Sequence, residues 1–143
     1  MQTSAALDFL GGQRVFGRSK QSVLEVNDLI RAGFPAQALA AFKDRTHLTN
    51  REVARALGVS EKTVERAATQ GLIKPATSDR LYRMARIVEL ATEVLCDELQ
   101  TFEWLRSPQH GLGDRIPLDL LATDAGTEQV KTELLRIKFG FLA

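Results

Sequence analysis

The sequence predicts an all-α protein, and three observations lead to that fold class. Residues 78–96 carry an apolar stripe at spacings of three and four, as one buried face of a helix requires. Two shorter helical patterns, at 49–57 and 60–70, are separated by Gly58 and predict a tight helical pair. No stretch shows the period-two alternation that a half-buried strand needs. The stripe consists of Leu81, Met84, Ala85, Val88, Ala91, Thr92 and Leu95.

The residues before the helical pair predict an N-terminal arm and two helices. In residues 1–20, two apolar pairs are bounded by glycines, which suggests a short strand or an extended, flexible arm. Ser22, with Glu25 three positions later, forms a capping-box pattern that begins a helix ending at Gly33. Pro35 suits the first turn of the next helix, which continues to about residue 46.

The residues after the stripe predict shorter helical segments. A helix around residues 99–105 ends at Ser107-Pro108, a glycine-containing loop follows, and residues 117–121 form a helical turn. Thr123 can cap a last helix that ends at Gly140. We therefore divide the chain into an arm (1–20), a first helical domain (21–76) and a second helical domain (77–143).

Charge is distributed unevenly between the two halves of the chain. Lysine and arginine outnumber aspartate and glutamate by 12 to 8 in residues 1–80, but the acidic residues lead by 10 to 7 in residues 81–143. The basic half is where a nucleic-acid partner is expected, and the acidic half suits a protein partner. The overall content, 44% hydrophobic and 26% charged residues, is typical of a globular protein rather than a disordered one.

Several classes of protein are disfavoured by the residues present. We find no secretory signal and no apolar run long enough to span a membrane, and the lone Cys96 has no disulfide partner, so we expect a cytoplasmic protein with this thiol buried as a small hydrophobe. His47 and His110 are far apart, with no ligands at metal-binding spacing. Without a catalytic constellation, we expect no enzymatic activity, no cofactor and no metal.

The segment 48–67 satisfies the geometric demands of a helix-turn-helix. Thr49 and Glu52 form a capping-box pair at the start of its first helix, and Ser60 can cap the second. Gly58 stands where the turn needs a positive φ. The small Ala54 lies where the two helices cross. The other apolar positions that turn inward are Val53, Leu57, Val59, Val64 and Ala67.

In a helix-turn-helix the second helix enters the major groove of DNA, with its N-terminal residues toward the base edges. The start of the first helix lies against the phosphate backbone. Glu61 and Glu65 put negative charge on the same face, which favours the alternative of a motif kept only for packing or dimerisation. The side chains that we assign to DNA binding are Thr49, Asn50, Arg51, Ser60, Lys62, Thr63 and Arg66.

Three linked stretches in the second half carry a family resemblance: 78–90, the run Trp-Leu-Arg-Ser-Pro at 104–108, and 112–126. Together with residues 33–35 and the C-terminal end, they resemble the antitoxins of the Xre/MbcA/ParS family. The resemblance covers about residues 33–143. It implies a Cro-like helix-turn-helix followed by a small helical toxin-binding domain. Two positions depart from the family pattern: Leu95-Cys96 stands where relatives often have Phe-Gly, and Lys138-Phe139 makes an unusually apolar end.

The resemblance also implies a role in a type II toxin–antitoxin system. Relatives pair with toxins of the RES or ParT kind, which consume NAD or use it for ADP-ribosylation. The antitoxin covers the NAD pocket of the toxin, and the complex represses its own operon. We expect a homodimer, because one helix-turn-helix covers only a half-site. The alternatives are a stand-alone transcription regulator whose C-terminal half only dimerises, and a DNA-binding adaptor from a mobile element.

The side chains assigned to toxin binding come from the acidic half, and each has a structural alternative. Trp104 either fills the core or acts as a rigid aromatic anchor at the interface. Arg83 either pairs with acidic neighbours on a solvated face or contacts an acidic lip of the toxin. The apolar C-terminal end either packs on its own domain or docks in a partner. The assigned residues are Arg83, Trp104, Arg106, Arg115, Phe139 and Phe141.

Overall fold

The computed structural model describes residues 5–17 and 22–140, and every regular element in these ranges is helical. The predicted all-α class is therefore confirmed. Between residues 33 and 116 the chain also makes two isolated β-bridges, Pro35 with Leu72 and Gln109 with Arg115. The elements are η1 (Ala5–Leu10), α1 (Gly12–Phe16), α2 (Val23–Ala32), α3 (Ala36–Thr46), α4 (Asn50–Leu57), α5 (Glu61–Thr69), α6 (Pro75–Leu95), α7 (Glu98–Arg106), η2 (His110–Leu112), α8 (Pro117–Leu120) and α9 (Asp124–Phe139).

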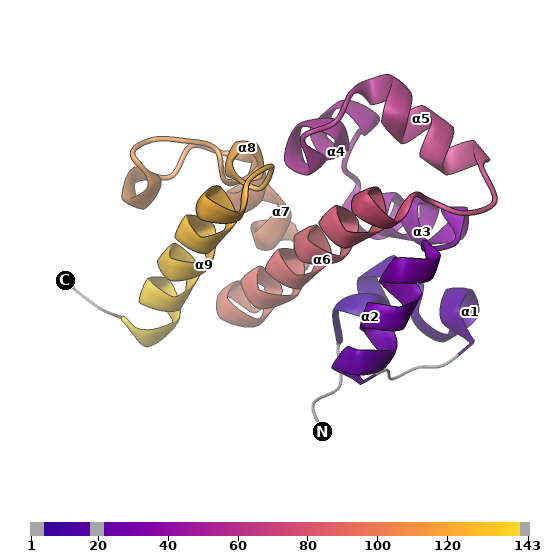
Figure 1. Ribbon diagram of the computed structural model, residues 1–143. Helices are drawn as coiled ribbons and strands as arrows, with labels where there is room; N and C mark the ends of the chain where they lie inside the picture. Colours follow the sequence, from indigo (N-terminus) through magenta and orange to yellow (C-terminus); the bar gives the residue numbers. More distant parts are fainter. Residues whose placement is uncertain (1–4, 18–21, 141–143) are drawn as a thin grey trace.

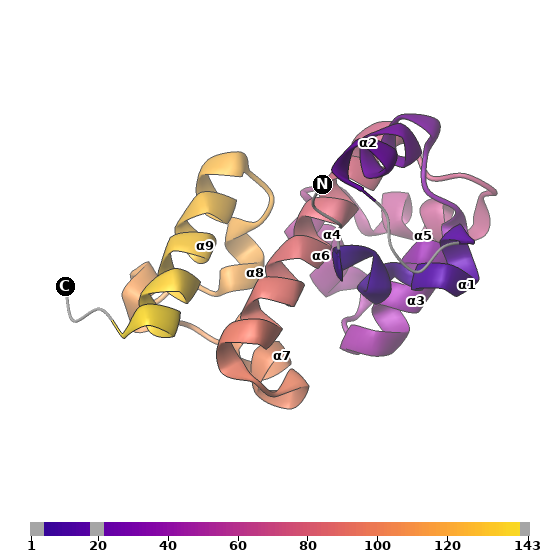
Figure 2. The ribbon, with the colours of Figure 1, turned by 90° about the horizontal axis from the view of Figure 1, so that it is seen from below.

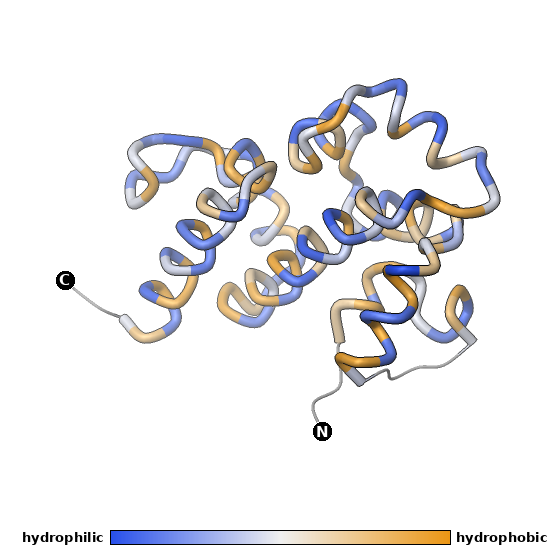
Figure 3. Tube along the Cα trace, in the orientation of Figure 1, coloured by the Kyte–Doolittle hydropathy of each residue, from blue (hydrophilic) through white to orange (hydrophobic). Residues whose placement is uncertain are grey.

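The long helix α6 is the centre of the molecule. It runs between the N-terminal helices on one side and α7, α8 and α9 on the other (Figures 1 and 2). Hydrophobic positions recur along it between hydrophilic ones (Figure 3), as the apolar stripe predicts. Leu81, Ala85, Val88 and Ala91 have no exposed surface. The hydrophobic core is continuous from η1 to α9, so it crosses the expected domain boundary at residue 77.

The expected N-terminal arm is wrong for the residues that the structure describes. Residues 5–10 form the 3₁₀ helix η1, and α1 follows directly. Leu7, Phe9 and Leu10 are buried against α3 and α6. The apolar residues that suggested a strand are therefore core residues of a short helix. Because η1 is too short for a helical period to stand out, its pattern could not be distinguished locally from an extended segment.

Most predicted helix ends are confirmed by their capping hydrogen bonds. Ser22 and Glu25 form the predicted capping box at the start of α2. Thr123 accepts a hydrogen bond from the Gly126 N–H at the start of α9. These polar side chains satisfy backbone N–H groups that have no partner within the helix.

Cys96 is exposed, contrary to the expectation that its thiol is buried. It ends α6 in a left-handed conformation with φ of 60°. This conformation favours glycine, the residue that the family resemblance leads us to expect here. The departure from the family pattern therefore falls on a helix end, as expected.

Among the helices of residues 5–17 and 22–140, none has the length and apolar character of a membrane-spanning segment.

Candidate functional site

The helix-turn-helix forms as predicted. In α4, the Thr49 hydroxyl accepts from the Glu52 N–H, and the Glu52 carboxylate accepts from the Thr49 N–H at 3.0 Å. Gly58 ends α4 with φ of 70°, and its N–H donates to the carbonyl groups of residues 54 and 55. The Ser60 hydroxyl then accepts from the Thr63 N–H at the start of α5. The motif at 48–67 is therefore a helix pair with both N-termini capped.

Helix α5, the predicted recognition helix, presents its side chains to solvent to different degrees. Ser60, Lys62 and Arg66 are exposed, and Thr63 is half-buried. Neither cation is paired with a carboxylate in the described part of the chain. The Ser60 and Thr63 hydroxyl groups lie 3.0 Å apart and share a hydrogen bond. Lys62 and Arg66 are thus the predicted side chains of this helix that offer an exposed positive charge, unpaired within the described residues.

At the start of α4, fewer of the residues predicted to bind DNA have side chains that are free to contact a partner. The Thr49 hydroxyl is used as the cap, and the Asn50 side-chain oxygen is buried with no hydrogen-bond partner among residues 5–17 and 22–140. Arg51 is exposed. Of the three, only Arg51 offers an outward charged group to a phosphate.

A small cleft of about 100 Å³ lies between α5 and the start of α6. Arg66 lines it together with Lys74, Gln70 and Thr77, and no carboxylate lines it. Lys74, which the sequence analysis does not single out, lies in the linker after the motif, directly before Pro75 at the start of α6.

The residues predicted to bind a toxin do not form one cluster. Arg83 pairs with Asp79 at 3.7 Å on α6. Trp104 is half-buried, packs against the core and lines a shallow apolar hollow with Leu95 and Leu99. Arg115 is exposed.

The C-terminal end of α9 carries the remaining predicted aromatic residues. Phe139 is exposed, and the Lys138 ammonium lies 5.6 Å from its ring centroid. Phe141 lies outside the described residues.

Arg106 has an intramolecular role that sequence reasoning did not predict. Its guanidinium binds the Glu52 carboxylate, with Nε 3.1 Å from Oε2, and also donates to the His47 carbonyl at 3.4 Å. Arg106 therefore joins α7 to the capping box of the helix-turn-helix. The predicted partner surface loses this guanidinium because it is already bonded.

Three further contacts hold the helix-turn-helix against the C-terminal half. Arg55 of α4 pairs with Asp119 of α8 at 2.6 Å, and Arg80 of α6 donates to the Leu57 carbonyl at 3.2 Å. A Cβ added to Gly58 would lie 3.0 Å from the Cβ of Ala122, so the turn packs closely on the segment before α9. The position of α4 thus depends on residues from 23 to 64 positions away along the chain.

The pKa of Glu52 follows from these contacts. Burial raises the pKa, but the Thr49 N–H and the Arg106 guanidinium favour the charged form and together lower it below its usual 4.5. A carboxyl with a lowered folded-state pKa stabilises the fold above its unfolded pKa, and this stabilisation disappears as pH falls through the folded pKa. Glu52 therefore contributes stability at neutral pH that is lost in acid.

We expect Arg106→Ala to lower the free energy of unfolding by about 1 kcal/mol at pH 7, the scale of a partly exposed ion pair. The difference from the wild type should shrink as the pH falls through the lowered folded-state pKa of Glu52, where this carboxyl becomes protonated. Urea denaturation at pH 7 and at successively lower pH values measures both effects. In a Glu52→Gln background the same substitution should have little effect, and an equal loss in both backgrounds would contradict the assigned pairing.

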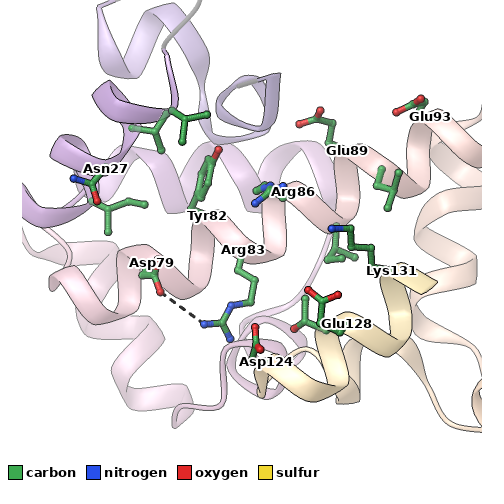
Figure 4. Close-up of a pocket in the computed structure, with 16 residues that line it drawn as sticks. Asn27, Asp79, Tyr82, Arg83, Arg86, Glu89, Glu93, Asp124, Glu128 and Lys131 are labelled. Atoms are coloured by element: carbon green, nitrogen blue, oxygen red, sulfur yellow. Dashed lines mark ion pairs between the residues drawn. The ribbon is translucent and has the colours of Figure 1, made fainter. Parts of the chain in front are cut away.

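A hollow of about 530 Å³ lies between α2, α6 and α9. Figure 4 shows Asp79 and Arg83 on α6 close to Asp124 of α9, with Glu128 and Lys131 farther along. In the described part of the chain, no group of three or more His, Cys, Asp or Glu is placed to hold a metal. The hollow is a surface groove lined by side chains of three helices.

Comparison with known proteins places these features in a family. Residues 25–86 match the Antitoxin Xre-like helix-turn-helix domain, and residues 90–140 match the Antitoxin Xre/MbcA/ParS C-terminal toxin-binding domain. An Antitoxin Xre from Pseudomonas putida is 31% identical over 84% of this chain and 75% of its own length. An Antitoxin Xre from Yersinia enterocolitica is 28% identical over 79% of this chain and 78% of its own length.

A solved structure shares the same arrangement of helices. One chain of the crystal structure of the M. tuberculosis MbcT–MbcA toxin–antitoxin complex superposes with a TM-score of 0.57 and 26% sequence identity. The match covers 76% of this chain and 96% of that chain. The two domain matches follow one another along the chain, and an Antitoxin Xre is similar over most of its length. The chain therefore belongs to the Xre family of antitoxins.

Proposed function

We propose that this protein neutralises a cognate toxin by covering the active site of that toxin, and that it represses its own operon through α4 and α5. The toxin is of the class that consumes NAD or uses it for ADP-ribosylation. Support comes from the toxin-binding domain match over residues 90–140 and from the likeness to a chain of a toxin–antitoxin complex. Operator binding as a homodimer fits a motif that covers one half-site.

The observation that carries the proposal is the exposed apolar surface of the C-terminal domain. Six large hydrophobic side chains are exposed in the described ranges, and three of them lie within residues 90–140. Leu99 is 73% exposed and Phe139 is 61% exposed, and Ile137 is the third. We infer that the toxin covers these side chains, because a partner that buries them removes apolar surface from water.

The test is a growth assay with the toxin encoded in the adjacent reading frame. The toxin alone should arrest growth, and co-expression of this protein should restore it. We expect the double substitution Leu99→Lys and Phe139→Lys to weaken toxin binding at least tenfold and to reduce rescue, because charged side chains resist burial in an interface.

Leu72→Lys is the matched control, because Leu72 is 59% exposed but lies outside the toxin-binding domain. It should rescue growth as the wild type does. An adjacent frame without toxicity, together with tight operator binding by this protein alone, would instead favour the stand-alone transcription regulator.

A further inference from the structure

The groove between α2, α6 and α9 has the length of a short helix. It extends along α6 from Asp79 to Glu93, which is about 21 Å at the helical rise of 1.5 Å per residue. Side chains of α2 form one wall and side chains of α9 form the other. A groove of this shape admits an α-helix laid along α6.

The floor of the groove is apolar. Val26 and Ile87 are buried at its base, and Ile30 and Leu90 are half-buried. Val23, at the start of α2, lines the groove with 52% of its surface exposed. An occupant that brings its own apolar side chains would therefore remove hydrophobic surface from water.

The rim is acidic. Five carboxylates and three cations line the groove. Asp79 is already paired with Arg83, and Glu93 is paired with Lys138 from outside the groove. The remaining lining charges are Glu89, Asp124 and Glu128 against Arg86 and Lys131.

Glu89 lies on the rim among one cationic and two acidic neighbours. Burial raises its pKa, the nearby Arg86 lowers it, and the carboxylates of Glu93 and Asp8 raise it further, so the pKa lies above its usual 4.5. A cation brought to this carboxylate would relieve the repulsion from its neighbours. Charge complementarity thus favours a basic occupant.

We infer that this groove binds a basic amphipathic helix of the toxin, with apolar residues on the floor and lysine or arginine toward Glu89, Asp124 and Glu128. The inference rests on the proposed function and assigns a position within that interface. Leu90, Glu93 and all of the α9 lining residues fall in the segment that matches the toxin-binding domain. The Glu93–Lys138 ion pair also joins the end of the groove to the end of α9 that carries the exposed Phe139.

The experiment measures binding of the purified toxin to two groove variants and two matched controls. Val23→Lys and Glu128→Lys change lining residues. Leu24→Lys and Gln129→Lys introduce a lysine one residue along on the same helices, at exposed positions that do not line the groove. All four positions are exposed, so the variants should fold like the wild type, which circular dichroism checks.

We expect each groove variant to weaken toxin binding about tenfold in isothermal titration calorimetry and each control to stay within twofold of the wild type. The Glu128→Lys complex should also lose less affinity than the wild-type complex as salt is raised, because fewer opposite charges meet. Amide hydrogen exchange should show toxin-dependent protection of residues 23–30 on α2, which lies outside the toxin-binding domain match.

Wild-type affinity in both groove variants, or equal losses in groove and control variants, would overturn the groove assignment while leaving the proposed function intact. Failure of the wild-type protein itself to bind the toxin would instead overturn the proposed function, and the groove assignment with it.

Discussion

Leu10→Ala is expected to lower the free energy of unfolding by about 3 kcal/mol, the cost of a large-to-small substitution at a buried leucine. Leu10 has no exposed surface, and the η1 helix that carries it packs against both α3 and α6. A loss of this size corresponds to a melting temperature about 10 °C lower for a domain of this length. Urea denaturation and a thermal melt followed by circular dichroism measure the two quantities.

Arg14→Ala on α1 is the control for this effect, because Arg14 is exposed and only four positions away. It should change the free energy of unfolding by less than about 0.5 kcal/mol. If the N-terminal segment were the loose arm that its sequence suggests, both substitutions would have this small effect. The size of the Leu10 effect therefore decides whether η1 is an integral part of the core.

Lys62→Ala combined with Arg66→Ala is expected to weaken operator binding about a hundredfold, because one base-edge contact and one phosphate contact are lost. Both side chains are exposed on α5, and neither is paired with a carboxylate in the described ranges. The dependence of log affinity on log salt should also become shallower by about one charge, because one phosphate contact is lost. Fluorescence anisotropy with labelled operator DNA at several salt concentrations measures both effects.

The charge-matched control is Arg14→Ala combined with Arg31→Ala. These exposed arginines lie on α1 and α2, away from the recognition helix α5 (Figure 1). Their removal should change operator affinity by less than about threefold. If both double variants lost affinity equally, the net charge of the protein would explain binding, and α5 would not be the recognition helix.

Features set by nearby residues could be predicted from the sequence. The helix-turn-helix depends on Thr49 with Glu52, on Gly58 and on Ser60, and each acts on backbone groups within four positions. The apolar stripe of α6 likewise repeats within the helix that it defines. Such patterns predict local structure without knowledge of the fold, because a cap or a helical face involves only neighbouring residues.

Features that depend on distant residues could not be predicted in this way. Arg106 looked like an interface anchor, but its partner is Glu52, fifty-four positions earlier. The groove brings residues of α2, α6 and α9 together, and nothing in their spacing along the chain predicts that they share a surface. Cys96 looked buried by type, but its position at the end of α6 leaves it exposed.

The sequence by itself thus determined the all-helical class, the helix-turn-helix and its register, and the family. Only the tertiary structure decided that the N-terminal segment belongs to the core, that Arg106 joins the two halves, and that an acidic groove borders α9. The physical reason is the range of the interactions. Capping and helical periodicity act within a turn or two, but burial and ion pairing depend on which segments the fold brings together.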